Sequence, residues 1–448
     1  MRIRILCLLG AFAALVTSNL EPSPSEDEIY DDIFQLVEEK ETLKQKLKTL
    51  DATKERANRG VSDAKCARLS DRVKELQNDV EASHDELSRL RKELENVVET
   101  RNQLERTAQC DEENEKESEI EFRGRFTFPV ESVRKYDASD PKVAESVKKG
   151  IPIVIGGTNM TRSLVGKWTL KYLADQLGDQ IIRMSISENH KFMYFSQENR
   201  GRYEWNPTYK INQGTFQTFI DLMETLDAAD NGTRVYFQHL LRELVLSAGL
   251  ENDRGNFNWN FIDDLRLSSG WGEWKDNLLL VGMRDVTTPA HYDSMENLFT
   301  MVSGYKRCFL FDPSQFAGLY PYPVHHPHDR QSQVDFDHPN FDQFPRFREV
   351  RALEAVLSPG DVLYIPAYWW HYVESARKGT TVSLNFWFLP AWTGKNAKRQ
   401  MPESVQYVHA QREVETLIGK LTHPSKVGRV LTDILHRRFE FLQSEATP

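Results

Sequence analysis

Two histidines and an aspartate in this 448-residue chain have the types and spacing of a metal site. His291 and Asp293 stand two residues apart in the stretch TPAHYDSMENLF, and residues two apart in a β-strand share one face. His371 ends a later stretch, SPGDVLYIPAYWWH, which reads as a turn, a buried strand and an aromatic cluster. Two imidazoles and one carboxylate can hold Fe(II) from one side and leave its other positions open. The three residues therefore predict an iron site, although an HxD pair alone is weak evidence because many strands contain one by accident.

A cation and several polar residues are expected close to this site. Lys306 begins the apolar run KRCFLF, and a lysine inside such a strand is costly to bury unless an anion pairs with it. The far carboxylate of 2-oxoglutarate would be such an anion; the alternative is that Lys306 is an exposed strand end. In TVSLNFW, the period of two puts Ser383, Asn385 and Trp387 on one face. Asn385 would then face the metal-bound end of the ligand, and Trp387 would line the pocket.

Short β-rich runs separated by Pro and Gly must position these residues, and they predict a mainly β fold, an antiparallel sandwich or barrel with helices. The expected strands are 151–155, 278–281, 308–311, 362–365 and 380–388. Helical patterns occupy 164–178 and 216–250, and two amphipathic helices follow Pro402, one ending at Leu421 and one carrying Val427, Leu431, Ile434 and Leu435. The two C-terminal helices either pair two copies of the chain or pack on their own sheet.

The first 18 residues have the pattern of a secretory signal peptide. Arg2 and Arg4 precede an apolar run at 5–16, and small residues follow at the expected cleavage point. This predicts the secretory pathway, either the endoplasmic reticulum lumen or secretion, with glycans at the sequons of Asn159 and Asn231. An unused signal would instead leave the protein in the nucleus or cytoplasm. The C-terminus is not a KDEL-type retention signal.

Residues 19–110 have the pattern of a coiled coil. From Leu69 to Leu104 the seam positions alternate by four and three, a period of 3.5 residues, and they are apolar except at Ser83 and Arg101. The same register places Cys66 in the seam. This favours self-association over a single amphipathic helix lying on the globular part. In an oxidising lumen the two Cys66 thiols could form an interchain disulfide, provided that the geometry of the seam brings their Cβ atoms close enough for the bond. An acidic linker, residues 111–121, comes next.

Composition excludes several classes of partner. A formal net charge of -10 argues against a nucleic-acid binder, which usually presents a basic face. No stretch beyond the signal is long and apolar enough to predict a transmembrane helix. The absence of a Cys-x-x-Cys pair argues against a structural zinc site.

Several segments together resemble the JmjC-domain Fe(II)/2-oxoglutarate oxygenases, in particular the asparaginyl hydroxylases of the factor-inhibiting-HIF type. They are TPAHYDSMENLF, GYKRCFLFDPSQFAGLYPYPVHHPHDRQSQ, SPGDVLYIPAYWWHYVES and VSLNFWF. The resemblance covers residues 122–448. It implies a double-stranded β-helix, the jelly roll of cupin and JmjC domains, in 122–395 and a C-terminal helical dimerisation segment in 396–448.

The resemblance also implies a role for each site residue. The implied Fe(II) ligands are His291, Asp293 and His371. The residues implied for 2-oxoglutarate are Lys306, Thr288 and Tyr236 at its far carboxylate, and Asn297 and Asn385 at its chelating end. Those implied for the protein substrate are Gln238, Arg330, Gln331 and Trp387.

The predicted function is therefore a protein hydroxylase that acts on Asn, Asp or His side chains and releases succinate and CO2. One alternative is a lysine demethylase, which the lack of accompanying zinc-binding reader modules disfavours. The other is a non-catalytic lumenal coiled-coil scaffold, which the intact ligand set disfavours. Ser294 and Met295 depart from the glutamine-rich residues usual after the aspartate in these hydroxylases. The departure leaves the iron site intact, but the resemblance then does not determine which target the enzyme selects. The signal peptide is a second departure, because a lumenal enzyme does not meet nuclear or cytosolic targets.

Overall fold

A computed structural model describes residues 120–124, 126–201, 203–393 and 400–434. The predicted signal peptide at 1–18, the coiled coil at 19–110 with its Cys66, and all but the last two residues of the acidic linker lie outside the described residues, as does Leu435. Within the described ranges, none of the helices combines the length and the apolar character needed to cross a bilayer.

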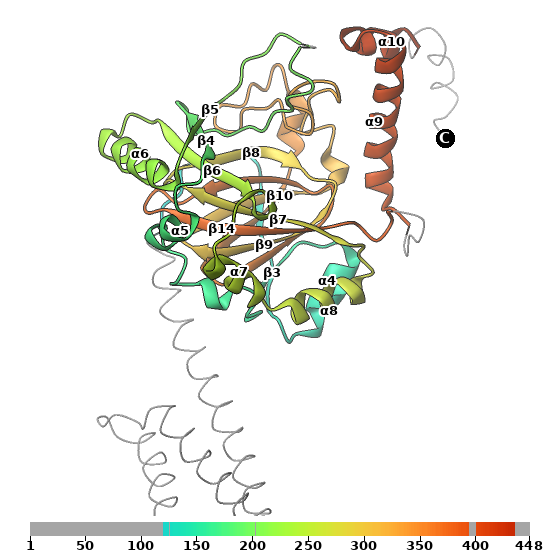
Figure 1. The fold of residues 1–448 in the computed structure, drawn as a ribbon. Helices are drawn as coiled ribbons and strands as arrows, with labels where there is room; N and C mark the ends of the chain where they lie inside the picture. Colours follow the sequence, from blue (N-terminus) through green and yellow to red (C-terminus); the bar gives the residue numbers. More distant parts are fainter. Residues whose placement is uncertain (1–119, 125, 202, 394–399, 435–448) are drawn as a thin grey trace, which may run out of the picture. The chain divides into compact units, whose positions relative to one another are not determined.

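Two mixed β-sheets face each other as a sandwich (Figure 1). The five-stranded sheet contains, in spatial order, β1 (Val130–Ser132), β11 (Ala352–Leu357), β10 (Lys306–Phe311), β13 (Trp370–Ser375) and β8 (Thr287–Tyr292). The nine-stranded sheet contains, in order, β2 (Lys135–Asp137), β3 (Ile153–Gly156), β12 (Val362–Ile365), β9 (Glu296–Ser303), β14 (Thr381–Phe388), β7 (Trp274–Gly282), β6 (Arg234–Leu240), β4 (Ile182–Ser187) and β5 (Lys210–Gly214). The strand expected at 362–365 has the predicted bounds, and that expected at 380–388 begins one residue later.

The expectation of antiparallel pairing needs one correction. The described strands pair antiparallel except in two places, where β1 lies parallel to β11 and β2 parallel to β3. Both exceptions involve short strands that precede the sandwich in the chain and add to sheets formed by later strands. Such additions are long-range pairings, which local sequence patterns do not reveal.

Helices surround the nine-stranded sheet. They are α4 (Pro141–Lys149), α5 (Leu170–Leu177), α6 (Phe216–Ala229), α7 (Ala248–Gly255) and α8 (Trp259–Ser269). The prediction of a helical run through 216–250 is wrong in its centre, because β6 occupies Arg234–Leu240. Asp230 ends α6 in a left-handed conformation, and the segment RVYFQHL that follows is rich in the β-branched and aromatic residues that favour a strand.

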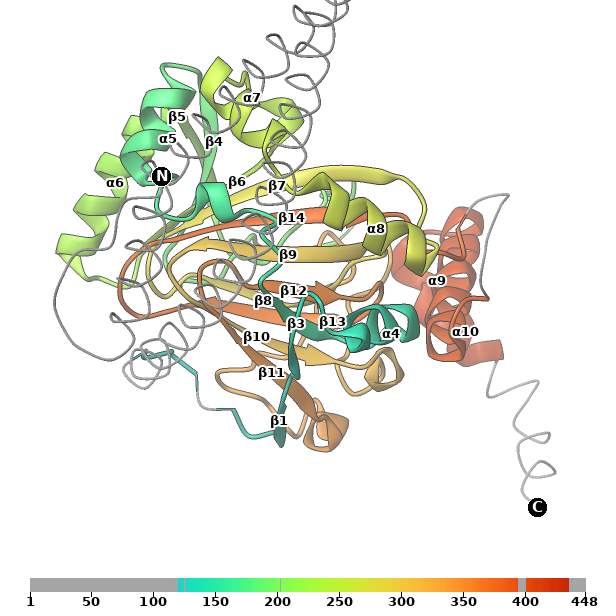
Figure 2. The ribbon, with the colours of Figure 1, turned by 90° about the horizontal axis from the view of Figure 1, so that it is seen from below.

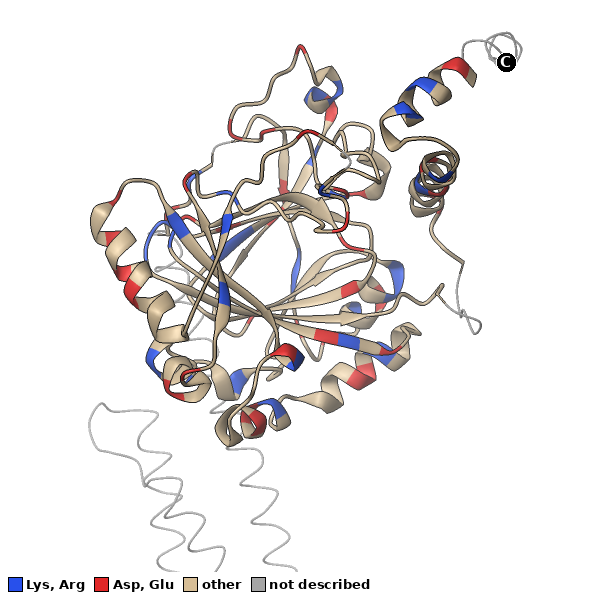
Figure 3. Cartoon of the chain, turned by 45° about the horizontal axis from the view of Figure 1, so that its top comes forward, with Lys and Arg blue, Asp and Glu red and all other residues tan. Residues whose placement is uncertain are grey.

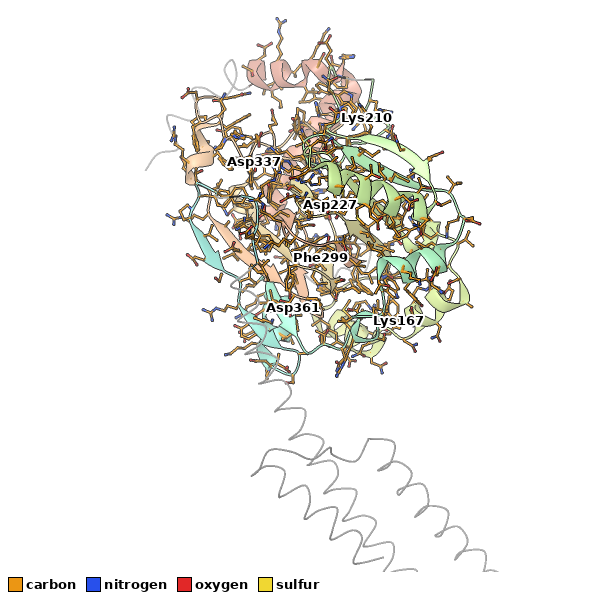
Figure 4. The ribbon with its side chains drawn as sticks, turned by 90° about the vertical axis from the view of Figure 1, so that its left-hand side faces the viewer. Lys167, Lys210, Asp227, Phe299, Asp337 and Asp361 are labelled. Carbon is orange, nitrogen blue, oxygen red and sulfur yellow. The ribbon has the colours of Figure 1, made fainter. Side chains whose placement is uncertain are left out.

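Two hydrophobic cores hold the described part together. The first lies between the sheets and under the helices; it includes Phe299, which Figure 4 labels in the interior of the domain, whereas Lys167 and Lys210 lie near its surface. The second lies on the outer side of the five-stranded sheet, where Phe309 and Phe311 of β10 pack with Phe128 and Phe336. The inner faces of the two sheets therefore surround the position where the predicted site must lie.

Two C-terminal helices, α9 (Glu403–Leu421) and α10 (Val427–Ile434), confirm the prediction of helices after Pro402, and Figure 2 shows them beside one end of the sandwich. Val405 and Val408 of α9 are buried. The opposite side of α9 presents an exposed apolar stripe, made of Tyr407, Val414, Leu417 and Leu421. Elsewhere, acidic and basic residues are interspersed over the described helices, strands and loops (Figure 3).

Candidate functional site

The three predicted metal ligands meet at one end of the five-stranded sheet. His291 lies near the end of β8, and it is directly paired with His371 of β13. Asp293 stands one residue beyond the end of β8, so the period-two argument places it correctly although the strand has already ended. One ligand atom from each side chain lies within 4.8 Å of the others. The two imidazole centroids are 4.1 Å apart, and His371 Nε2 lies 4.0 Å from the Asp293 carboxylate.

Both imidazoles are oriented by the backbone. His291 Nδ1 lies 2.9 Å from the Pro289 carbonyl oxygen, and His371 Nδ1 lies 3.1 Å from that of Trp369. A carbonyl accepts only from a protonated Nδ1, so each ring has its Nε2 as the free acceptor, the form in which histidine binds a metal. Two independent strands thus present the same tautomer to the same point.

The electrostatics of the cluster suit a divalent cation. Burial lowers the pKa of both imidazoles, that of His291 to about 3, which keeps the rings neutral. Burial acts to raise the pKa of Asp293, but attraction by the imidazoles of His291 and His371 when they are protonated, and by the Arg330 guanidinium, holds this pKa below its usual value. Two neutral imidazoles and one carboxylate are the protonation states that metal coordination needs.

The predicted substrate residues Arg330 and Gln331 lie directly beside the ligands. Arg330 Nη1 is 3.3 Å from Asp293 Oδ1, and Gln331 forms an isolated β-bridge with His291. Arg330 has a φ of +67°, a left-handed conformation that is uncommon outside glycine. This segment therefore lies directly against the ligand cluster.

Lys306 is enclosed in the sandwich and is not an exposed strand end, since only 1% of the residue's surface is exposed to solvent. Its Nζ donates to Ser383 Oγ at 3.0 Å and to the Tyr236 hydroxyl at 3.3 Å, and it lies over the Phe299 ring. The side chains of Thr288 and Gln238 lie close enough to the Tyr236 hydroxyl to act against the rise in its pKa that burial causes. Within the described part of the chain no carboxylate pairs with Lys306, so a buried cation has hydroxyl partners only.

Other predicted residues carry buried polar atoms that the described residues leave without hydrogen-bond partners. They are both side-chain amide atoms of Asn297, Oδ1 of Asn385, Oε1 of Gln331 and Nε1 of Trp387. Strand register puts three of them in reach of each other, because Trp387 pairs with Asn297 and Asn385 with Phe299 on the same face. Native proteins rarely leave buried polar groups unsatisfied, so this set indicates the place of a polar ligand.

The isolated charge of Lys306 leads to a prediction on pH. Burial lowers the pKa of Lys306 from 10.5 to about 8 in the folded chain. Between these values the unfolded chain binds more protons, so the free energy of unfolding should rise as pH goes from 8 toward 10.5. The cost of the charge below pH 8 is of order 3 kcal/mol, at 1.36 kcal/mol per pH unit. Denaturant unfolding at several pH values measures this slope, and Lys306→Met should flatten it; an equal slope in the variant would contradict the assignment.

Sequence reasoning missed the contacts that support this site from outside. Arg412 of α9 bonds the hydroxyl of Tyr292, which stands between the predicted ligands His291 and Asp293, and the carboxylate of Asp329, which precedes Arg330. A signal was present, because Arg412 follows Val405 and Val408 at helical spacing, on the side of α9 that faces the domain. A charged residue on that face calls for a buried partner, but the helical pattern does not say which one.

A comparison with protein-family models gives a match to much of the described part of the chain. Residues 139–393, more than half of the chain, match the model of the Cupin-like domain. The matched range contains all twelve residues predicted for the site.

Curated relatives match over shorter stretches. "HSPB1-associated protein 1" of Homo sapiens is 38% identical over 117 residues, which are 25% of this chain and 23% of that protein. "JmjC domain-containing protein C" of Dictyostelium discoideum is 32% identical over 120 residues, 25% of this chain and 28% of that protein. "Lysine-specific demethylase JMJ30" of Arabidopsis thaliana is 27% identical over 240 residues, 53% of this chain and 50% of that protein. The matches thus span about a quarter to a half of the length of these relatives.

Proposed function

The chain belongs to the Cupin-like domain family, and on this basis we propose that it is an Fe(II)- and 2-oxoglutarate-dependent oxygenase that hydroxylates a protein side chain. The observation that carries the proposal is the pairing of two features in one sandwich. One is the His291, Asp293 and His371 cluster; the other is the buried Lys306, a cation with no anion among the described residues. On this reading, the two facing sheets are a double-stranded β-helix of the JmjC type.

Each side chain has a task in this proposal. His291, Asp293 and His371 hold the metal from one side, and Lys306 with the hydroxyls of Tyr236 and Thr288 binds the far carboxylate of 2-oxoglutarate. Fe(II) and 2-oxoglutarate, when bound, supply the oxidative chemistry, in which dioxygen converts 2-oxoglutarate to succinate and CO2 and hydroxylates the substrate.

The remaining groups bind and orient. The free amide atoms of Asn297 and Asn385 would hydrogen-bond the chelating end of 2-oxoglutarate. Gln238, Arg330, Gln331 and Trp387 would hold the substrate segment. The apolar walls around Phe299 exclude water from the reacting groups.

The decisive experiment follows both products. Purified full-length protein with Fe(II), 2-oxoglutarate and a library of Asn-, Asp-, His- and methyl-lysine-containing peptides should release succinate, and mass spectrometry should find one peptide carrying an added oxygen. Loss of a methyl group instead would establish the lysine demethylase, the activity that the name of the Arabidopsis relative JMJ30 gives to that protein. Absence of succinate with every peptide, from protein shown to bind metal, would favour the non-catalytic scaffold.

We also propose that the exposed stripe of α9 pairs two copies of the chain. Tyr407, Leu417 and Leu421 are 65%, 58% and 79% exposed, a large apolar area for an isolated helix face. Leu417→Asp with Leu421→Asp should therefore convert a dimer of residues 118–448 to a monomer in analytical ultracentrifugation, while the matched His409→Asp, on an exposed position outside the stripe, should not. A wild-type monomer at tens of micromolar would contradict the pairing.

For the compartment, we propose the secretory pathway, because residues 1–18 have the pattern of a signal peptide and both sequon asparagines, Asn159 and Asn231, are exposed. The mature protein should begin near Asn19 and carry a glycan on Asn159 or Asn231. Peptide mapping of protein made in animal cells, with and without glycosidase, measures this. An unglycosylated chain that retains residues 1–18 would place the enzyme outside the secretory pathway.

A further inference from the structure

The C-terminal helix α9 reaches the metal site through one loop. The loop, residues 323–331, contains Asp329, Arg330 and Gln331, and α9 contacts it on three successive turns. Arg412 bonds Asp329, and Glu415 accepts from the Val324 backbone N–H at 3.0 Å. Gly419 lies against the His325 ring, which would have to shift to admit a Cβ atom. This loop-facing side of α9 is opposite the exposed apolar stripe.

Arg412 bonds two residues that adjoin the predicted metal site, Asp329 and Tyr292. Its Nη1 and Nη2 bond the two Asp329 oxygens at 2.7 and 2.8 Å, the two-point geometry that fixes both groups in orientation. Nη1 also donates to the Tyr292 hydroxyl at 2.9 Å. Both side chains of the pair are mostly buried, with 22% and 18% of their surface exposed.

Each partner of Arg412 is joined to the metal ligands. Tyr292 is the residue between His291 and Asp293, and its backbone N–H donates to the Arg330 carbonyl at 3.2 Å. Asp329 precedes Arg330, whose left-handed backbone must be held in place and whose guanidinium contacts Asp293 at 3.3 Å. The guanidinium of Arg412 therefore restrains two segments at once. One is β8, through Tyr292, and the other is the loop whose Arg330 contacts Asp293.

We propose that Arg412 is a positioning residue for the metal centre, acting through Tyr292 and through the Asp329–Arg330 segment. The inference rests on the proposed function for its biological meaning, but its central prediction concerns metal binding alone. Removing groups that orient metal ligands typically costs 10- to 100-fold in affinity, and Arg412 acts through such groups. Its loss should therefore weaken metal binding about tenfold while the fold persists.

The test measures Co(II) affinity of the full chain by titration of the visible absorption band, together with thermal unfolding. Arg412→Gln should raise the dissociation constant about tenfold. Arg412→Lys keeps the positive charge but not the two-point guanidinium geometry, so its Co(II) dissociation constant should lie between those of wild type and Arg412→Gln. The matched control is Glu415→Ala, which removes a different polar contact between the same helix and the same loop. Its Co(II) dissociation constant should stay within about twofold of wild type.

A double-mutant cycle makes the mechanism specific. In an Asp329→Asn background, Arg412→Gln should cost clearly less than it does in wild type, because the two side chains act as a pair. Unchanged Co(II) affinity in Arg412→Gln would overturn the proposal, and so would an equal loss in Glu415→Ala, which would mean that any loosening of α9 suffices. If Arg412→Gln fails to fold, Arg412→Lys and Asp329→Asn decide by the same comparison. A wild-type protein that binds no Co(II) would instead refute the proposed metal site itself.

Discussion

Replacing His371 by alanine should abolish turnover and reduce metal affinity by more than about a hundredfold, beyond the loss expected when only an orienting partner is removed. The reason is that the described residues place three ligand atoms within 4.8 Å of one another, so that loss of one leaves two protein ligands. Asp293→Ala should behave alike. Succinate release measures turnover, and Co(II) titration measures affinity without depending on any substrate.

The matched control for this prediction is His409→Ala, which removes an exposed histidine of α9 without touching the cluster. Circular dichroism should show that all three variants are folded, because the cluster lies at one end of the sandwich and outside both hydrophobic cores. Undiminished turnover in His371→Ala would refute the ligand assignment even if metal still bound elsewhere on the protein.

Replacing Lys306 by methionine should raise the 2-oxoglutarate concentration needed for half-maximal turnover roughly tenfold to a hundredfold. A hydrogen bond to a charged group contributes about 1.5–3 kcal/mol, and each 1.4 kcal/mol is a factor of ten. The same change should stabilise the ligand-free protein below pH 8, because it removes a buried charge whose hydrogen-bond partners among the described residues are the Ser383 and Tyr236 hydroxyls. Opposite effects on ligand binding and on stability distinguish a binding cation from a structural one.

Thermal shift measurements with and without 2-oxoglutarate test both halves of this prediction. Wild type should gain stability on adding 2-oxoglutarate, and Lys306→Met should start higher and gain less. Lys210→Met, at an exposed lysine of the edge strand β5, is the control and should follow wild type. A lower ligand-free melting temperature in Lys306→Met, with an unchanged 2-oxoglutarate requirement, would make Lys306 a structural residue.

Local patterns were sufficient for the parts of the site that strand geometry determines. The spacing of His291 and Asp293 predicts a shared face, and the register of β8 with β13 brings His371 to them. Alternation in β14 likewise predicts that Ser383, Asn385 and Trp387 point together, and the bond from Lys306 to Ser383 shows that this face is the inner one. A strand fixes side-chain direction residue by residue, so such features are visible in a short stretch of sequence.

Other features depend on where distant segments meet. The pair of Arg412 and Asp329 joins residues 83 positions apart, and neither helical periodicity nor composition identifies which buried partner a helix-borne arginine finds. The sequence pattern does not reveal strand β6, because apolar residues on both sides of Arg234–Leu240 also fit a helical period. The short parallel strands β1 and β2 owe their pairing to strands that come much later in the chain. Tertiary contact decides each of these cases.

The two opposite sides of α9 have a thermodynamic consequence. If a second copy covers the stripe of Tyr407, Leu417 and Leu421 while Arg412 holds the metal site, both events act on one rigid helix. Coupling of this kind is reciprocal: any factor by which self-association improves metal affinity is the same factor by which bound metal tightens self-association. Scarcity of iron would then reduce the number of assembled pairs as well as the number of active centres. The quaternary structure of the protein would in that way report the metal status of its surroundings.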